Sequence, residues 1–120
     1  MKVVVVEPMK RAYVKDIDSG LESLQKEVDG YIEAIYPFED EVAIVCNEEG
    51  KLNHLDPNRG LFDEEGNLYD IIQGTFLVVG LTEDNFGSLS EELAKKYLRK
   101  YRHPEIFMKV APGKIVALRV

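Results

Sequence analysis

The sequence has one cysteine, no tryptophan and no hydrophobic run long enough to span a membrane. A single cysteine cannot form a disulfide within the chain, so a secreted disulfide scaffold is excluded and a reducing compartment is expected. The valines of Val3 to Val6 are too few for a signal-peptide core or a membrane helix. The sequence therefore predicts a cytoplasmic protein that makes no membrane contact.

Motifs for catalysis and metal binding are also missing. His54 and His103 lie far apart, and neither stands at metal-ligand spacing from Cys46. There is no GxSxG nucleophile elbow and no glycine-rich phosphate loop. Cys46 ends an apolar run, which favours a buried small hydrophobe over a reactive thiol. We therefore expect no metal and no cofactor, and the sequence favours a non-catalytic protein over an enzyme.

Basic residues are outnumbered: 15 Lys and Arg stand against 22 Asp and Glu, and the formal net charge is −7. Such a charge opposes binding to phosphate backbones, so nucleic acid is an unfavoured partner. Acidic residues are concentrated from Glu39 to Asp70, where ten of them face two basic residues. The basic residues gather instead on one predicted helix and its end, where nucleic-acid contact is an alternative: Lys95, Lys96, Arg99, Lys100 and Arg102.

Two β-rich runs, Tyr31 to Tyr36 and Val42 to Cys46, dominate the centre of the chain. Pro37 cannot donate a ladder hydrogen bond, and the carboxylates of Glu39 to Glu41 require water, so we expect a hairpin with an exposed loop. The second run is apolar without interruption, which is typical of a central strand covered on both faces.

The remaining segments complete an α+β pattern. Helices are predicted from Ser19 to Val28 and from Ser88 to about Arg102, each opened by a Ser-x-x-Glu capping box. Leu52 to Gly60 is interpreted as an ordered loop. Because Pro112-Gly113 favours a type II turn, whose twist suits a tight hairpin poorly, the last two apolar runs are expected to diverge. Further strands are predicted at Val3 to Val6, Ala12 to Ile17, Tyr69 to Ile72, Thr75 to Val79, Ile106 to Val110 and Ile115 to Val120.

We therefore predict a single domain over residues 1–120: a mainly antiparallel sheet of about five to six strands, with two amphipathic helices packed on one face. Residues 106–120 would add strands to it or act as an exchange tail, giving either a monomer or a homodimer. The predicted core contains Val4, Leu24, Ile32, Ile44, Phe76, Val78, Leu93 and Tyr97.

The polar stretch His54, Asn58 and Arg59 is the candidate ligand-binding site. An arginine in acidic surroundings can bind a carboxylate through two hydrogen bonds, which would suit a small ligand or an enzymatic site. The competing interpretation is that Asn58 and Arg59 tie the loop to the strands. The candidate interaction surface for a protein partner with a basic surface is Glu39, Asp40, Glu41, Glu64 and Glu65.

Five stretches of the chain form a recurring pattern: Gly30-Tyr31-Ile32-Glu33, Cys46-Asn47-Glu48-Glu49-Gly50, Pro57-Asn58-Arg59, Asp70-Ile71-Ile72 and Gly74-Thr75-Phe76. In these stretches, residues 1 to about 90 resemble a domain-of-unknown-function family of Gram-positive bacteria, their phages and conjugative elements. The resemblance implies a bacterial cytosolic or mobile-element setting, beside proteins of plasmid transfer or phage–host conflict, and it assigns no activity. Together with the missing catalytic motifs, this suggests a small acidic, non-catalytic protein-binding module.

Overall fold

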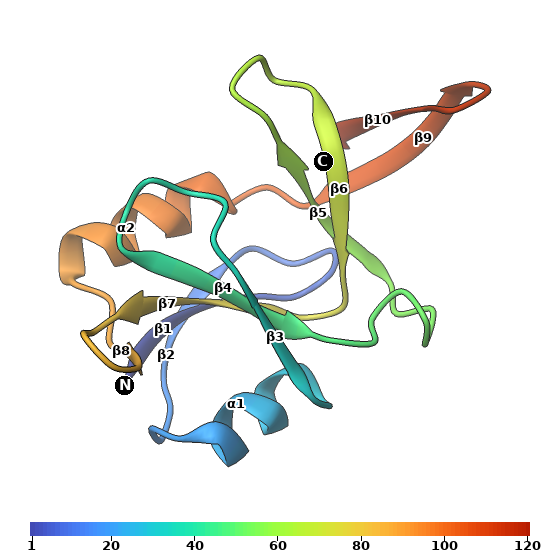
Figure 1. The fold of residues 1–120 in the computed structure, drawn as a ribbon. Coiled ribbons are helices and arrows are strands. Elements are labelled where there is room, and N and C mark those ends of the chain that lie inside the picture. The colour runs from blue at the N-terminus through green and yellow to red at the C-terminus, as the bar shows by residue number, and fades with distance from the viewer.

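The structure, a computed structural model, describes residues 1–120 and is organised around a six-stranded sheet (Figure 1). Every strand pair in this sheet is antiparallel. The predicted α+β class, with a mainly antiparallel sheet of five to six strands, is confirmed. The strands run in the order β2 (Tyr13–Asp16), β1 (Lys2–Val6), β7 (Phe76–Leu81), β4 (Val42–Asn47) and β3 (Ile32–Ile35), and β8 (Phe86–Gly87) pairs with β7.

The three middle strands of the sheet are buried on both faces. Successive side chains of a strand point to opposite faces, so the four consecutive valines of β1 divide between two apolar clusters. All six residues of β4 are buried, which confirms the prediction of a central strand there. Six of the eight predicted core residues are buried, while Ile32 and Leu93 lie half-buried at the edges of the clusters.

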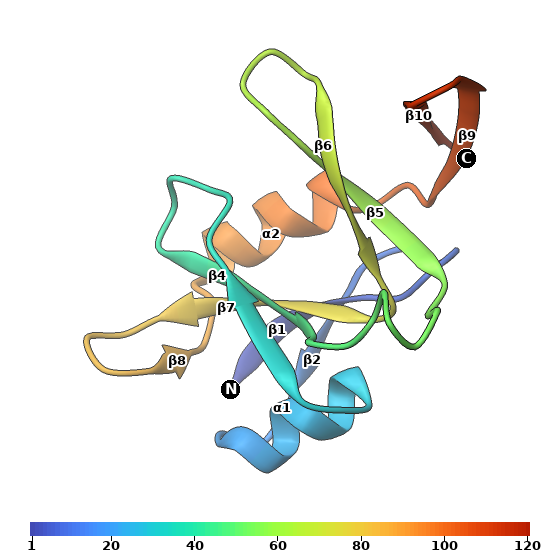
Figure 2. The ribbon, with the colours of Figure 1, turned by 45° about the vertical axis from the view of Figure 1, so that its right-hand side comes forward.

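The two helices cover opposite faces of this sheet (Figure 2). Helix α1 (Leu21–Val28) buries Leu24 and Val28 in one cluster, whereas α2 (Glu91–Lys100) buries Ala94 and Tyr97 in the other. The prediction that both helices pack on one face is therefore wrong. The apolar stripe of a helix shows that it needs cover, but it does not show which face of a doubly buried sheet provides that cover.

Neither predicted capping box forms. The residue preceding α1 is Gly20, which makes no side-chain cap, so Ser19 does not serve that helix. Ser90 caps α2 by accepting a hydrogen bond from the amide of Leu93 at 3.2 Å. Ser88 instead accepts from the amide of Lys2 at 2.9 Å, because its hydroxyl lies against the first strand. Long-range pairing with β1 therefore replaces the local motif.

A second hairpin, β5 (Pro57–Phe62) and β6 (Leu68–Gln73), crosses the α2 side of the sheet. The expected loop of residues 52–60 is thus wrong from Pro57 onward. Proline is acceptable as the first residue of a strand, and the glycine at position 60 lies close to Leu68, where an added Cβ would come within 2.6 Å of its Cδ1. Tertiary packing of Leu61 and Ile72 decides the structure here.

The last two strands, β9 (Glu105–Ala111) and β10 (Lys114–Arg119), pair directly with each other, so the expectation that they diverge is wrong. Gly113 has a positive φ of 74°, and a register shift between Lys114 and Ile115 follows the turn. Such an irregularity allows the turn to fit the strand twist. The hairpin projects from the rest of the molecule (Figures 1 and 2). Neither helix of the protein has the length and apolar composition needed to cross a membrane.

Candidate functional site

Arg59 lies on β5 with its side chain fully buried. Its Nη2 donates to the carbonyl oxygens of Lys10 at 2.7 Å and Tyr101 at 2.8 Å, and its Nη1 donates to Asn58 Oδ1 at 2.9 Å. Burial lowers the pKa of Arg59, and the nearby Glu105 carboxylate opposes that effect. Both Nη atoms of the guanidinium thus donate to groups of its own chain, whereas the buried Nε has no hydrogen-bond partner.

Asn58 is equally buried and holds the start of β5 in place. Its Nδ2 donates to the carbonyl oxygens of Val6 at 2.9 Å and Gly74 at 2.8 Å. One amide therefore links the end of β1 to Gly74, in the connection between β6 and β7. Together with the contacts of Arg59, this arrangement agrees with the structural interpretation of the pair, in which the two side chains tie β5 to the sheet and to α2.

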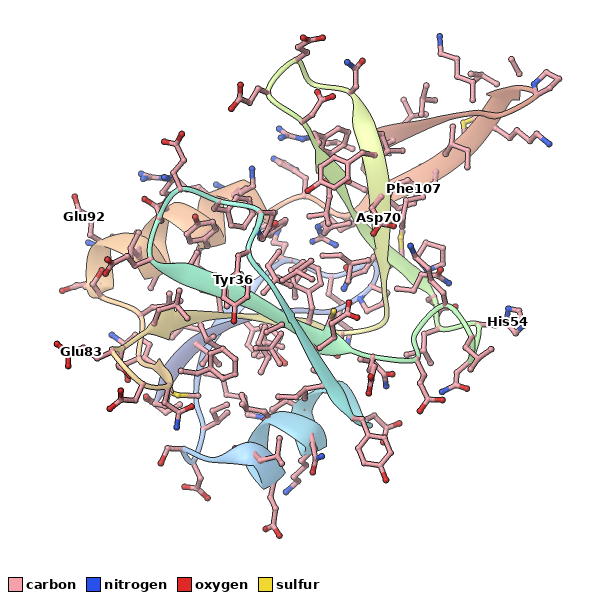
Figure 3. All side chains as sticks on the ribbon, in the orientation of Figure 1. Tyr36, His54, Asp70, Glu83, Glu92 and Phe107 are labelled. Carbon is pink, nitrogen blue, oxygen red and sulfur yellow. The ribbon has the colours of Figure 1, made fainter.

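His54 does not join them. It lies exposed in the turn after β4 with a positive φ of 55°, and its side chain points away from the molecule (Figure 3). The structure thus brings Asn58 and Arg59 together, but it does not bring all three predicted residues into one pocket. No group of three or more His, Cys, Asp or Glu side chains is placed to hold a metal ion.

The acidic loop between β3 and β4 rests on α2. Asp40 accepts hydrogen bonds from Lys96 Nζ at 2.6 Å and from the Tyr97 hydroxyl at 2.8 Å. The first of these contacts, followed by the second, lowers the pKa of Asp40. Glu39 and Glu41 are exposed and form no ion pair. The loop therefore uses one carboxylate internally and presents two to solvent.

The loop between β5 and β6 is also held by one of its own carboxylates, here through backbone amides of the loop itself. Asp63 Oδ1 accepts hydrogen bonds from the amides of Glu65 at 3.0 Å and Asn67 at 2.8 Å, and Gly66 has the positive φ of 82° that this turn requires. Glu64 and Glu65 are exposed and form no ion pair. Four of the five predicted interaction residues thus carry free carboxylates, and only Asp40 is engaged within the chain.

The basic residues of α2 are partly engaged as well. Lys96 pairs with Asp40, and Lys95 pairs with Glu91 at 3.8 Å. Lys100 Nζ lies 5.1 Å from the centre of the Phe38 ring. The acidic run and the basic helix, separate in the sequence, are therefore adjacent in space, and their charges partly compensate each other.

Two exposed aromatic side chains beside the acidic loops were missed by the sequence reasoning. Tyr36 is 61% exposed at the end of β3, and Phe62 is 45% exposed at the end of β5. The sequence does place an aromatic residue directly before each loop, which is the signal that could have identified them. Aromatic residues are enriched in protein–protein interfaces, so these two belong to the candidate surface.

A comparison with protein families gives one match. The model described as "Domain of unknown function (DUF3846)" matches residues 1–102, which covers both acidic loops, the buried arginine and α2, and leaves the β9–β10 hairpin outside. No curated protein and no solved structure is significantly similar to the chain.

Proposed function

The chain belongs to the DUF3846 family, and we propose that it acts as a small acidic, non-catalytic protein-binding module whose partner presents a basic surface. The observation that carries this proposal is the shared plan of the two acidic loops. Each loop is held in place by its own aspartate, Asp40 or Asp63, and each presents two free glutamates. In both ribbon views the β5–β6 loop forms the top of the molecule, and the β3–β4 loop lies below it, beside α2 (Figures 1 and 2).

Fixed loops reduce the cost of binding. A flexible acidic segment loses conformational entropy when a partner orders it, whereas a loop already ordered by its own hydrogen bonds loses less. The free carboxylates of Glu39, Glu41, Glu64 and Glu65 supply electrostatic attraction, and the exposed rings of Tyr36 and Phe62 supply apolar contact area. Charges of this kind mainly raise the association rate and favour partners of the opposite sign.

The resemblance noted in the sequence suggests where such a partner would be found. We propose that it belongs to a mobile element or to the conflict between phage and host, with a DNA-processing or defence protein as the basic-surfaced partner. Basic surfaces are common on such proteins because they contact phosphate backbones.

The test is affinity capture from the native host with three forms of the protein. The wild type is compared with a charge-reversed variant, Glu39→Lys/Glu41→Lys/Glu64→Lys/Glu65→Lys. The third form, Glu83→Lys/Asp84→Lys, changes two exposed charges in the β7–β8 loop, where Figure 3 labels Glu83, and leaves all four glutamates of the acidic loops unchanged. Retained proteins are identified by mass spectrometry at low salt and again at about 0.5 M salt, where exposed charges are largely screened.

The expected result is a basic-surfaced protein retained by the wild type and the β7–β8 variant, lost from the charge-reversed variant and released by salt. A partner retained equally by all three forms, or one whose binding ignores salt, would overturn the proposal. The substituted residues are exposed, so the variants should fold, and far-ultraviolet circular dichroism checks this.

A further inference from the structure

A second polar site lies apart from the acidic loops, in a pocket of about 260 Å³ between β3, β4 and β6. Strand β3 contributes Glu33 and Ile35, β4 contributes Cys46, and β6 contributes Asp70 and Ile71. Figure 3 shows Asp70 on β6. The volume is near the lower limit of pockets that hold small organic ligands.

The charge of this pocket is negative and not fully compensated. Lys51 is the one basic lining residue, and its ammonium is held by Asp70. Asp70 also accepts a hydrogen bond from the amide of Ile71 at 2.8 Å. Glu33 and Glu48 line the same pocket, are exposed and form no ion pair. Two carboxylates are therefore free to receive a positive charge.

The rest of the lining is apolar or neutral. Ile35, Ile71 and Ile72 provide aliphatic contact, and the Cys46 side chain is buried between them and Glu33. Burial, with the Glu33 and Asp70 carboxylates adding to it, raises the pKa of the Cys46 thiol to about 11. The thiol is thus protonated at neutral pH and is a poor nucleophile, because the thiolate is the reactive form. The lining suits binding and does not suit thiol chemistry.

We propose that this pocket binds a guanidinium or ammonium group carried on a short apolar stem. The cation would be held by Glu33 and Glu48, and the stem would lie against the isoleucines of β3 and β6. Two sources share this chemistry: a free cationic amine, or the arginine or lysine side chain of a bound protein. The inference goes beyond the proposed function, because the pocket and the acidic loops are built from different residues.

The experiment titrates the protein with agmatine, a free guanidinium on an aliphatic stem, and separately with the capped peptide acetyl-Gly-Arg-Gly-amide. Binding is followed by amide and methyl shifts of Cys46, Ile71 and Ile72 in NMR spectra. The site variant is Glu33→Gln/Glu48→Gln. The matched control is Glu83→Gln/Asp84→Asn, which removes the same number of charges from the β7–β8 loop.

Saturable binding is expected for the wild type and the control, and affinity should fall about tenfold or more in the site variant, because charged hydrogen bonds are lost. Tighter binding of agmatine would identify a free ligand, and tighter binding of the peptide would identify a side chain; either supports the shared chemistry. No saturable binding of either probe, or equal binding by the site variant, would overturn the inference. The variant with four reversed loop charges should keep this binding, so failure here is distinguishable from failure of the protein-binding proposal.

Discussion

The Nη2 atom of Arg59 lies 2.8 Å from the carbonyl oxygen of Tyr101, and this hydrogen bond ties β5 to the end of α2. The same nitrogen donates to the carbonyl oxygen of Lys10, in the connection between β1 and β2. One buried side chain thus joins three segments that are distant in the sequence. The Tyr101 carbonyl oxygen also accepts a longer hydrogen bond from the amide of Ala12, at 3.4 Å, so β5, the end of α2 and the β1–β2 connection meet at this point.

Replacing Arg59 by methionine should therefore destabilise the protein strongly. Methionine keeps the length of the side chain but donates no hydrogen bond. The carbonyl oxygens of Lys10 and Tyr101 therefore lose a charged donor, and that of Tyr101 keeps only the longer bond from the amide of Ala12. Hydrogen bonds to charged groups contribute about 1.5–3 kcal/mol each, so we expect a loss of about 3 kcal/mol, measured by urea denaturation. Arg102→Met, at an exposed position just after α2, is the control and should change the free energy of unfolding little. An Arg59→Met protein as stable as wild type would contradict the anchoring role.

The central hairpin, the apolar strands and both helices could be predicted, because their signals are local periodicities. The pairing of β9 with β10 could not, since an irregularity in register accommodates a turn that appeared unsuitable. Strand β5 could not be predicted because its sequence contains Pro57 and Gly60, which usually interrupt a strand. Proline is tolerated here because it is the first residue of the strand, and glycine because Leu68 lies close beside it. A sequence pattern shows which side chains of a segment must be buried, and the tertiary contacts decide which other segments bury them.

The candidate site, too, could be predicted from the sequence only in part. The acidic residues of both loops could be identified from composition, but the internal use of Asp40 depends on Lys96 and Tyr97, which lie more than fifty positions away. The burial of Arg59 could not be read from its acidic neighbours, because those neighbours turn to solvent while its own side chain enters the core. His54 was grouped with Asn58 by proximity in sequence, and a change of direction in the intervening turn separates them.

Asp40→Asn should change how stability depends on pH. The contacts of Asp40 with Lys96 and Tyr97 lower its pKa in the folded state below the ordinary value near 3.8. The unfolded chain therefore binds a proton more readily, so the ionised carboxylate stabilises the fold above about pH 4, and this contribution is lost as the pH falls through the lowered pKa. Urea denaturation should show wild type more stable than Asp40→Asn at pH 7, with the difference shrinking below about pH 4.

Glu39→Gln is the control for that comparison, because Glu39 is exposed in the same loop and forms no ion pair. It should follow the wild type across the whole pH range. A difference between wild type and Asp40→Asn that stays constant from pH 7 to pH 3 would show that the contacts of Asp40 do not depend on its charge.

The β9–β10 hairpin should tolerate polar substitutions. Met108 is 49% exposed and Leu118 is 44% exposed, and the register places them with Ile106 and Val116 on one face of the hairpin. Met108→Gln/Leu118→Gln should change the free energy of unfolding by less than about 1 kcal/mol, whereas Ile44→Ala in the buried sheet should cost about 2–5 kcal/mol. The same double variant should bind less of an apolar fluorescent dye than wild type, since an exposed aliphatic face is removed. A loss comparable to that of Ile44→Ala would mean that the hairpin face is covered.

Contact of α2 with nucleic acid is testable by gel shift at low salt. Lys96 and Lys95 are engaged by Asp40 and Glu91, and the whole chain carries a net charge of −7. We expect no shift of double-stranded DNA by wild type at about 50 mM salt, where electrostatic binding is strongest. Asp40→Asn frees Lys96 and serves as the sensitised variant. A shift that requires Arg99 and Arg102 would instead support an interface on this helix.

Glu33→Gln should make the Cys46 thiol more acidic. The folded protein holds the pKa of Cys46 at about 11, mainly through burial and next through the Glu33 carboxylate, which repels the thiolate. Removing that charge lessens the repulsion, so the thiolate should form at lower pH, while the burial of Cys46 keeps its pKa above the ordinary value near 8.5. Thiolate absorbance, followed as the pH is raised, measures the change directly, and Glu83→Gln provides a control for loss of a distant carboxylate. An unchanged titration of Cys46 in Glu33→Gln would mean that the two side chains do not interact electrostatically across the pocket.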